Sequence, residues 1–364
     1  MRLNVFSHPL ALVAAILASA GLAGCAGNPP PANTASSAAA ATAPATLPAA
    51  APARSGAIEP PAPVRIGVAL GGGAVKGFAH IGVIKMLEAN GLAPAVVAGT
   101  SAGSVVGALY ASGMSAFELQ EKAVALDETK IRDLQLSSGG LLVGQKLEDY
   151  VNEQVRRKPL EQLAKPFVAV AARLEDGERT VFSRGNTGQA VRASSSVPGV
   201  FQPVTIGAHH FVDGGIVSPV PVDAARQLGA DVVIAVDISN KARGKSPADL
   251  LGTVGQSIAI MGQKLGQAEL ARADVIIRPE VLDIGPTDFA QRANAILQGE
   301  KAALAAMPQI RERVGRLQAE RTQAAQAARQ RVLDAQQQAC LDNRSRLQKL
   351  AGMAGLGPDC APAP

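Results

Sequence analysis

Aromatic side chains are scarce in this sequence. Its 364 residues include no Trp, 2 Tyr and 8 Phe, although 47% of them are hydrophobic, and the formal net charge is a modest +5. Proteins that read nucleic acids stack bases on aromatic side chains beside their basic groups. The composition therefore argues against a nucleic-acid-binding protein.

Cysteines and metal-binding patterns are equally rare. Three cysteines are too few for a disulfide-stapled scaffold, and no Cys-x-x-Cys pair or His/Cys spacing typical of zinc sites occurs. The sequence also lacks a calcium loop and a nucleotide-binding motif. We therefore expect no metal and no other cofactor.

The first residues are typical of an exported lipoprotein. Arg2 precedes an apolar stretch over residues 10–22, which is shorter than the roughly 20 residues that span a bilayer. The sequence LAGC at residues 22–25 resembles a bacterial lipobox. This resemblance implies a signal peptide over residues 1–24 and fatty acylation of Cys25, which would anchor the protein to a membrane. Ala26 resembles the second residue of outer-membrane lipoproteins, so we expect the periplasmic face of that membrane. An ordinary secretory signal is the alternative.

Residues 25–63 are almost entirely Ala, Pro, Ser and Thr, which predicts an extended tether without a core. The globular part begins near Val64, where the run VRIGVAL predicts a buried strand. A helical pattern follows and ends at Asn90-Gly91, and PAVVAG then predicts a second strand. A strand, a helix and a strand within about 35 residues form a βαβ unit with parallel strands.

Further signals extend this α/β pattern along the chain. Ser115 and Glu118 have the spacing of a helix capping box, and a hairpin is expected to turn at Asp176-Gly177. ADVVIAVDIS and ADVIIRPEV predict two more strands, each after a helical segment. We therefore expect one α/β domain over residues 64–306 with a mostly parallel sheet, and a mostly solvated helical extension over residues 307–364.

Ser101 lies in the sequence GTSAG, between Gly99 and Gly103, where a predicted strand becomes a predicted helix. A Gly-x-Ser-x-Gly sequence in that context predicts a nucleophile elbow, with the backbone N–H of Ala102 facing the same space. A plain strand-to-helix turn, in which Ser101 caps the helix, is the alternative.

A glycine-rich loop leaves the same edge of the sheet. Gly71, Gly72 and Gly73 follow the first strand, so their N–H groups are able to approach an oxyanion or a phosphate. The loop is not a P-loop, because Lys76 precedes Gly77 and no Gly-Lys-Ser/Thr sequence follows. Together the two loops predict a nucleophile beside an oxyanion hole.

The base that accepts the serine proton has several candidates. His80 lies at helical spacing with apolar residues, which favours a packed histidine. His209 and His210 lie on a predicted strand, and either of them suits a Ser–His–acid triad. Asp213 ends that strand, and Gly214 and Gly215 leave its carboxylate uncrowded.

Four stretches resemble one known family. GGGAVKGFAHIGV, GTSAG, ASSSVPGVFQPV and VDGG occur in the order and spacing of the patatin-like phospholipases, over residues 64–279. The resemblance implies a three-layer α/β fold and a Ser–Asp dyad without a catalytic histidine. It makes Ser101 the nucleophile, Asp213 its base and residues 71–73 the oxyanion hole. Lys76 stands where the family more often has arginine; it keeps the charge but lacks the bidentate fork.

The resulting expectation is a membrane-anchored serine hydrolase that cleaves fatty-acyl esters of phospholipids or lysophospholipids through an acyl-enzyme. The alternatives are a Ser–His–acid esterase and a non-catalytic envelope lipoprotein that binds an anionic ligand. We expect Asp213 to be shielded from water, because burial makes a carboxylate a better base. Cys340 and Cys360 are expected to form a disulfide after export. The basic region after Pro308 predicts either a solvated helix or a contact with an anionic membrane.

Overall fold

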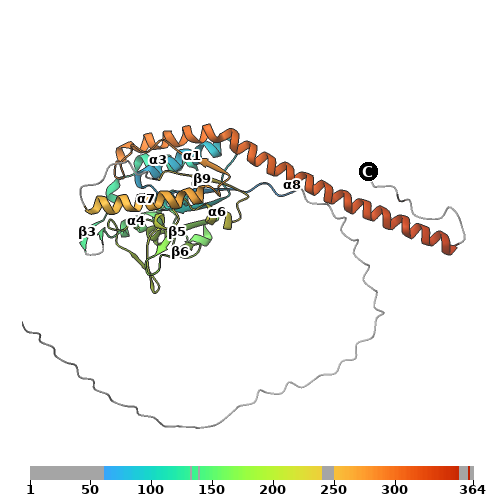
Figure 1. Ribbon diagram of the computed structural model, residues 1–364, viewed down its shortest axis with the longest axis horizontal. Coiled ribbons are helices and arrows are strands. Elements are labelled where there is room, and N and C mark those ends of the chain that lie inside the picture. The colour runs from blue at the N-terminus through green and yellow to red at the C-terminus, as the bar shows by residue number, and fades with distance from the viewer. Residues whose placement is uncertain (1–60, 132, 138–139, 240–249, 352–359, 361–364) are drawn as a thin grey trace, which may run out of the picture. The chain divides into compact units, whose positions relative to one another are not determined.

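The computed structural model describes residues 61–131, 133–137, 140–239, 250–351 and 360 (Figure 1). The expected signal peptide, Cys25 and nearly all of the expected tether lie outside these residues. The described part contains a central sheet with helices on both of its faces (Figure 1).

The sheet has eight strands, and seven of them follow the order β10-β9-β1-β2-β5-β8-β7 while β6 pairs with β5. The first five strands in this order run parallel, whereas β6, β7 and β8 pair antiparallel. The mostly parallel α/β sheet expected from the sequence is therefore confirmed. The strands are β1 (Ile66–Leu70), β2 (Val96–Thr100), β5 (Phe167–Arg173), β6 (Arg179–Phe182), β7 (Val204–Ile206), β8 (His209–Asp213), β9 (Val232–Val236) and β10 (Val275–Ile277). A separate hairpin pairs β3 (Leu134–Ser137) with β4 (Gly140–Leu142).

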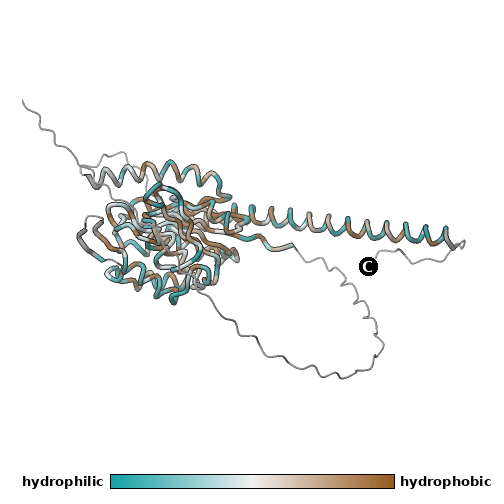
Figure 2. The backbone as a smooth tube through the Cα atoms, turned by 90° about the horizontal axis from the view of Figure 1, so that it is seen from below, coloured by the Kyte–Doolittle hydropathy of each residue, from teal (hydrophilic) through white to brown (hydrophobic). Residues whose placement is uncertain are grey.

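Helices form the two outer layers because successive strand residues point to opposite faces of the sheet. Val68 and Leu70 of β1 pack into the larger core beneath α1, α2, α3, α4 and α8, while Ala69 packs into the smaller core beneath α6. Figure 2 shows brown, hydrophobic segments concentrated inside the domain. The helices are α1 (Phe78–Ala89), α2 (Ala102–Ala111), α3 (Ala116–Ala125), α4 (Gln145–Gln154), α5 (Thr187–Ser194), α6 (Val222–Gln227), α7 (Leu250–Leu270) and α8 (Arg292–Ala351).

Local sequence signals place several of these boundaries as expected. Ser115 and Glu118 form the predicted capping box at the start of α3. Gly91 follows α1 with a φ of +72°, the left-handed conformation that glycine adopts without strain. The hairpin of β5 and β6 turns over Asp176-Gly177 as predicted.

The register of the sheet brings the C-terminal ends of two strands, β2 and β8, together. Thr100, the last residue of β2, pairs with Val170, and Asp213, the last residue of β8, pairs with the next residue, Ala171. Because β6 occupies the other edge of β5 over the same residues, β2 and β8 share one edge and meet end to end. The residues that follow these two strands are therefore close in space.

Helix α8 joins the domain to its extension without interruption. The expected boundary between residues 306 and 307 falls inside this helix, which continues through Pro308. Met307 and Ile310 are still buried, and Gln318 accepts a hydrogen bond of 3.0 Å from the Val64 backbone N–H. Packing on both sides of Pro308 keeps the helix continuous where the sequence suggested a division.

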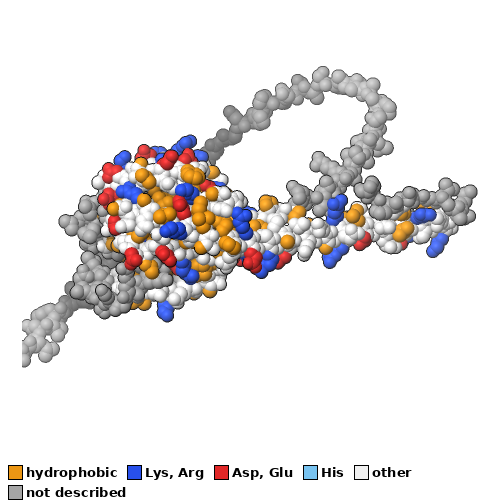
Figure 3. All heavy atoms as spheres, turned by 90° about the horizontal axis from the view of Figure 1, so that it is seen from above, with side chains coloured by type: hydrophobic (Ala, Val, Ile, Leu, Met, Phe, Trp, Pro, Cys, Tyr) orange, Lys and Arg blue, Asp and Glu red, His pale blue; other side chains and the backbone are white. Residues whose placement is uncertain are grey.

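Beyond residue 322 the side chains of α8 are mostly exposed, as expected for a solvated helix. Figure 3 shows Lys and Arg side chains, in blue, spread along this outer part. The predicted disulfide between Cys340 and Cys360 is confirmed. Among the helices of the described part, none combines the length and the hydropathy required to cross a membrane.

Candidate active site

Ser101 occupies the sharp turn between β2 and α2. Its φ of +54° is a left-handed conformation that costs a non-glycine residue about 1–3 kcal/mol. The turn is held by the Ser101 backbone, whose N–H donates to Ser194 Oγ (3.0 Å) and whose carbonyl accepts from Ser104 Oγ (2.7 Å). A side chain at Gly103 would place its Cβ 2.1 Å from the Leu70 carbonyl oxygen. The expected sharp turn between a strand and a helix is therefore present at Ser101, and it needs glycine at position 103.

Gly99 serves the same close packing, because an added Cβ would lie 2.5 Å from the Gly103 carbonyl oxygen. Gly77 plays the corresponding part beneath the first turn of α2, where an added Cβ would lie 2.6 Å from the Ala102 Cβ. The glycines predicted to support the motifs thus allow three backbone segments to approach each other around Ser101.

Asp213 meets Ser101 across the junction of β2 and β8. Its carboxylate accepts a hydrogen bond of 2.7 Å from the Gly215 N–H and lies near enough to the Ser101 hydroxyl for that group to favour its charged form. The side chain is only 6% exposed, as expected. Burial raises the pKa of Asp213 to about 6, although the Ser101 hydroxyl and the Gly215 N–H both favour the charged carboxylate. At Gly214 a Cβ would lie 2.1 Å from the Val170 carbonyl oxygen, so this approach also requires glycine.

The glycine loop offers fewer free amides than expected. The N–H of Gly71 donates to the Val236 carbonyl (3.1 Å), which extends the pairing of β1 with β9. The N–H of Gly72 donates to the Pro219 carbonyl (3.0 Å). These two N–H groups therefore hold the loop in shape and are not available to an oxyanion, in contrast to the prediction that included Gly71 and Gly72 in an oxyanion hole.

The two remaining amides belong to Gly73 and Ala102. Both residues line the cavity that contains Ser101. Neither N–H has an acceptor among the described residues. Ala102 is also the first residue of α2, where the helix dipole favours negative charge. This pair is suited to stabilise an oxyanion.

His80 is a packed residue, as the sequence favoured. Its ring is fully buried, and its Nε2 lies 2.8 Å from the Gly71 carbonyl oxygen. Burial lowers the pKa of His80 to about 4, so the ring is neutral at physiological pH and donates to the loop carbonyl. Lys76, in the 3-10 turn Ala74–Gly77, is 1% exposed and therefore does not face solvent.

His209 and His210 lie at the opposite end of β8 from Asp213. Both are exposed, and His210 Nδ1 lies 2.9 Å from Glu175 Oε1. The structure thus brings Asp213, and neither of these histidines, to the Ser101 hydroxyl.

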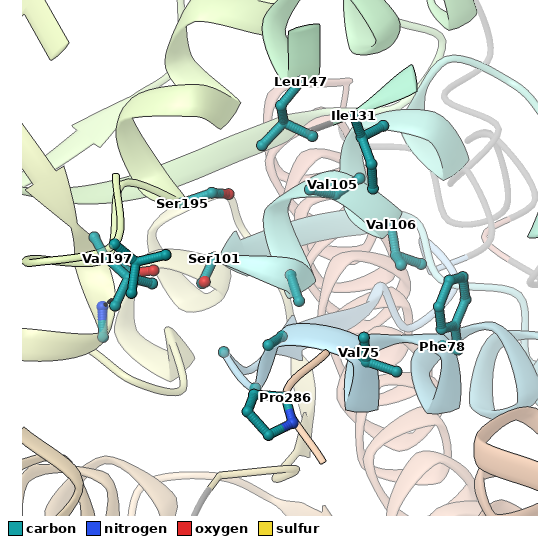
Figure 4. Close-up of a pocket in the computed structure, with 18 of the residues that line it drawn as sticks. Val75, Phe78, Ser101, Val105, Val106, Ile131, Leu147, Ser195, Val197 and Pro286 are labelled. Carbon is teal, nitrogen blue, oxygen red and sulfur yellow. Dashed lines mark hydrogen bonds between the residues drawn. The ribbon is translucent and has the colours of Figure 1, made fainter. Parts of the chain in front are cut away.

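An apolar cavity of about 520 Å³ begins at Ser101 and Asp213. Its walls come from the 3-10 turn Ala74–Gly77, from α1, α2, α3 and α4, and from the segments that follow α3 and α5. Figure 4 shows Val75, Phe78, Val105, Ile131 and Leu147 among the lining residues. This volume lies within the range of sites that enclose small ligands. Among the described residues no group of His, Cys, Asp and Glu side chains is arranged to hold a metal ion.

Glu269 of α7 supports the site through hydrogen bonds, and the sequence analysis did not identify it. It is 5% exposed, accepts from the Val220 N–H at 2.9 Å, and accepts from the Ser218 hydroxyl. The segment it holds also receives the Thr100 hydroxyl, at 2.8 Å from the Ser218 carbonyl oxygen. Glu269 therefore fixes the strip of backbone that joins the elbow to the glycine loop. No motif marks it, because its partners lie about 50 residues away.

The chain is similar to several known proteins in this region. Residues 68–226 match the family model described as patatin-like phospholipase. An uncharacterized NTE family protein of Mycobacterium tuberculosis is 37% identical over 183 residues, which are 50% of this chain and 51% of that protein. Patatin-like phospholipase domain-containing protein 6 of Homo sapiens is 31% identical over 202 residues, 53% of this chain and 14% of that protein.

The chain spans about half the length of the mycobacterial relatives that it matches. Among solved structures, VipD from Legionella pneumophila aligns with a TM-score of 0.47 and 17% sequence identity over 67% of each chain. The family match covers the elbow, the glycine loop and Asp213 together. Over residues 68–226, the chain is therefore similar to the patatin-like phospholipases.

Proposed function

We propose that this protein is a lipid acyl hydrolase in which Ser101 and Asp213 form a catalytic dyad. The observation that carries the proposal is that Ser101 and the buried carboxylate of Asp213 line the same apolar cavity, where the Ser101 hydroxyl acts on the pKa of that carboxylate. The family match supports a lipid ester as the substrate class. Phospholipids and lysophospholipids are the proposed substrates.

In the proposed acylation step, Ser101 Oγ attacks the ester carbonyl carbon while its proton passes to Asp213. The carbonyl oxygen becomes an oxyanion, which the N–H groups of Gly73 and Ala102 stabilise. Collapse of this intermediate breaks the bond to the alcohol oxygen, which takes the proton from Asp213. A fatty-acyl ester of Ser101 remains.

Water completes the cycle. Asp213 accepts a proton from the water as the water attacks the acyl-enzyme. The bond between the acyl carbon and Ser101 Oγ then breaks, Oγ takes the proton back from Asp213, and the fatty acid is released. The raised pKa of Asp213 serves both steps, because a carboxylate with a pKa of about 6 is a stronger base than an exposed one. The cavity walls contact the acyl chain, and its methylenes leave water at about 0.8 kcal/mol each.

A fluorophosphonate probe, which modifies activated serines, tests the proposal on purified protein. We expect labelling of wild-type protein, no labelling of Ser101→Ala and strongly reduced labelling of Asp213→Asn. Replacement of both His209 and His210 is the matched control and leaves labelling unchanged. A large loss in that control would favour a Ser–His–acid esterase. Unlabelled wild-type protein would favour a non-catalytic lipoprotein that binds an anionic ligand.

We further propose that acylated Cys25 anchors the protein at the periplasmic face of the outer membrane. Cys25→Ala tests this anchor, since it should release the protein from the membrane fraction. The outer part of α8 is proposed to lie along the anionic surface. Over residues 323–351 it carries five basic and two acidic residues. Two of the arginines that precede this part, Arg313 and Arg321, instead pair with Asp274 and Asp231 of the domain.

A further inference from the structure

Ser195 has a buried hydroxyl group in the wall of the cavity. The residue is 8% exposed and lines the cavity together with Ser101 and Asp213. Its backbone is satisfied, because its N–H donates to the Arg192 carbonyl (3.0 Å) and its carbonyl accepts from the Val197 N–H (2.9 Å). Its Oγ has no hydrogen-bond partner among the described residues. A buried hydroxyl without a partner is costly, and a ligand is able to satisfy it.

The neighbouring serines differ in this respect. The Ser194 hydroxyl accepts from the Ser101 N–H and donates to the Val170 carbonyl (2.6 Å). The Ser196 hydroxyl donates to the Arg192 carbonyl (2.9 Å), and Ser196 does not line the cavity. Of the three serines, only Ser195 both lines the cavity and has a hydroxyl without a hydrogen-bond partner among the described residues.

The position of Ser195 relative to the oxyanion hole follows from the strand order. β2, which Ser101 follows directly, lies between β1 and β5. The glycine loop follows β1, whereas Ser194 fixes the start of the Ser195 segment to β5. Figure 4 accordingly shows Ser195 on one side of Ser101 and Val75, at the end of the glycine loop, on the other.

A tetrahedral intermediate on Ser101 Oγ has three other substituents: the oxyanion, the acyl chain and the alcohol oxygen. The oxyanion faces Gly73 and Ala102, and the acyl chain enters the apolar cavity. We propose that the Ser195 hydroxyl donates a hydrogen bond to the third substituent, the alcohol oxygen of the scissile ester. This inference rests on the proposed function and adds a substrate-contacting residue to it.

The hydrogen bond from Ser195 assists the departure of the alcohol. As the bond between the carbonyl carbon and the alcohol oxygen breaks, its electron pair moves to that oxygen, and the proton that Asp213 took from Ser101 is transferred there. Ser195 keeps its own proton and stabilises the negative charge that develops before the transfer is complete. Hydrogen bonds to charged groups stabilise more than those between neutral groups.

Two esters with the same acyl chain test this role. One has an alkyl alcohol as leaving group, and the other has 4-nitrophenol, whose anion is stable without a donor. We measure kcat/KM, which reports acylation, for wild-type protein and Ser195→Ala. The expected loss is about tenfold or more for the alkyl ester and less than about threefold for the nitrophenyl ester. Ser195→Thr, which keeps the hydroxyl, should recover most activity on the alkyl ester.

Stability gives a second readout. Ser195→Ala removes an unpartnered polar group, so its Tm should equal or exceed that of wild-type protein. Ser196→Ala is the matched control: it loses a buried hydrogen bond, lowers Tm and leaves the ratio of the two kcat/KM values unchanged. Equal losses on both esters with Ser195→Ala, or no loss on either, would overturn the assignment. Wild-type protein that hydrolyses neither ester would overturn the proposed function itself.

Discussion

Replacement of Asp213 by Asn should abolish catalysis and stabilise the fold at the same time. Asn has the shape of Asp and is able to accept the 2.7 Å hydrogen bond from the Gly215 N–H. It cannot take a proton from Ser101, so the dyad no longer functions. It also carries no charge, so the molecule no longer holds an ionised group in a site that is 6% exposed.

The pKa of Asp213 gives the size of the expected gain in the free energy of unfolding. It rises from 3.8 to about 6 on folding. A shift of that size corresponds to about 3 kcal/mol at 1.36 kcal/mol for each pKa unit. Below pH 3.8 the group is protonated in both states, and its contribution to stability is complete. As the pH rises through about 6, the folded state loses a proton that it bound more tightly than the unfolded state. Above that pH the wild-type protein has lost these roughly 3 kcal/mol, whereas Asp213→Asn has not.

Urea-induced unfolding of both proteins between pH 4 and pH 8 measures this difference. The free energies of unfolding should be similar near pH 4 and should diverge as the pH rises, until Asp213→Asn is more stable by about 3 kcal/mol. His80, whose pKa is about 4, destabilises both proteins equally on acidification, so the difference between them removes its effect. Asp223→Asn is a suitable control, because Arg272 lowers the pKa of Asp223 and its replacement should bring no gain.

Two results would refute the reasoning. Asp213→Asn that is no more stable than wild-type protein at pH 8 would show that the carboxylate is not penalised by burial. A difference that stays constant across the pH range would show that its pKa is not raised. In the same pH series, kcat/KM of wild-type protein should rise to a plateau with a midpoint near pH 6, because only the ionised carboxylate accepts the serine proton.

Three further predictions concern the acyl cavity, α7 and α8. Across a series of esters, kcat/KM should rise up to about fourfold for each methylene added to the acyl chain until the cavity is filled. Leu147→Trp narrows the cavity, so the acyl chain with the highest kcat/KM should be shorter. Glu269→Ala should lower kcat more than it changes KM, because it releases the Ser218 segment, while Glu269→Gln retains most activity; equal kinetics for both variants would contradict a positioning role. Truncation after Thr322 should leave ester hydrolysis intact but reduce salt-sensitive binding to anionic vesicles, and unchanged vesicle binding would exclude α8 as the contact.

The elbow could be predicted from the sequence because its determinants are local. The strand, the turn and the helix around Ser101 lie within 20 residues, and the glycines at positions 99 and 103 act on the same turn. The position of Asp213 came from the order of family motifs. Its physical cause, the end-to-end meeting of β2 and β8 along β5, is a property of the sheet that no local pattern contains.

The glycine loop shows the limit of such predictions. All three glycines have N–H groups that are equally available in the sequence, but two of these groups are used by carbonyl oxygens of Val236 and Pro219. Those acceptors lie more than 140 residues away. The predicted helical extension has a similar limit: it is helical, but its helix begins at Arg292 inside the domain and contacts the end of α1, where Arg311 donates to Asn90.

The three consecutive serines after Ala193 also have roles that their tertiary contacts decide and the sequence does not show. They are chemically identical, and the sequence assigns them no separate roles. Helix α5 ends among them, so their side chains leave the backbone in different directions. Ser194 faces the sheet and joins Ser101 to Val170, Ser196 turns back to the Arg192 carbonyl, and Ser195 lines the cavity. Three identical residues at the end of one helix thus have different roles. Ser194 links the Ser101 turn to β5, Ser196 bonds back to its own helix, and only the Ser195 hydroxyl has no partner among the described residues.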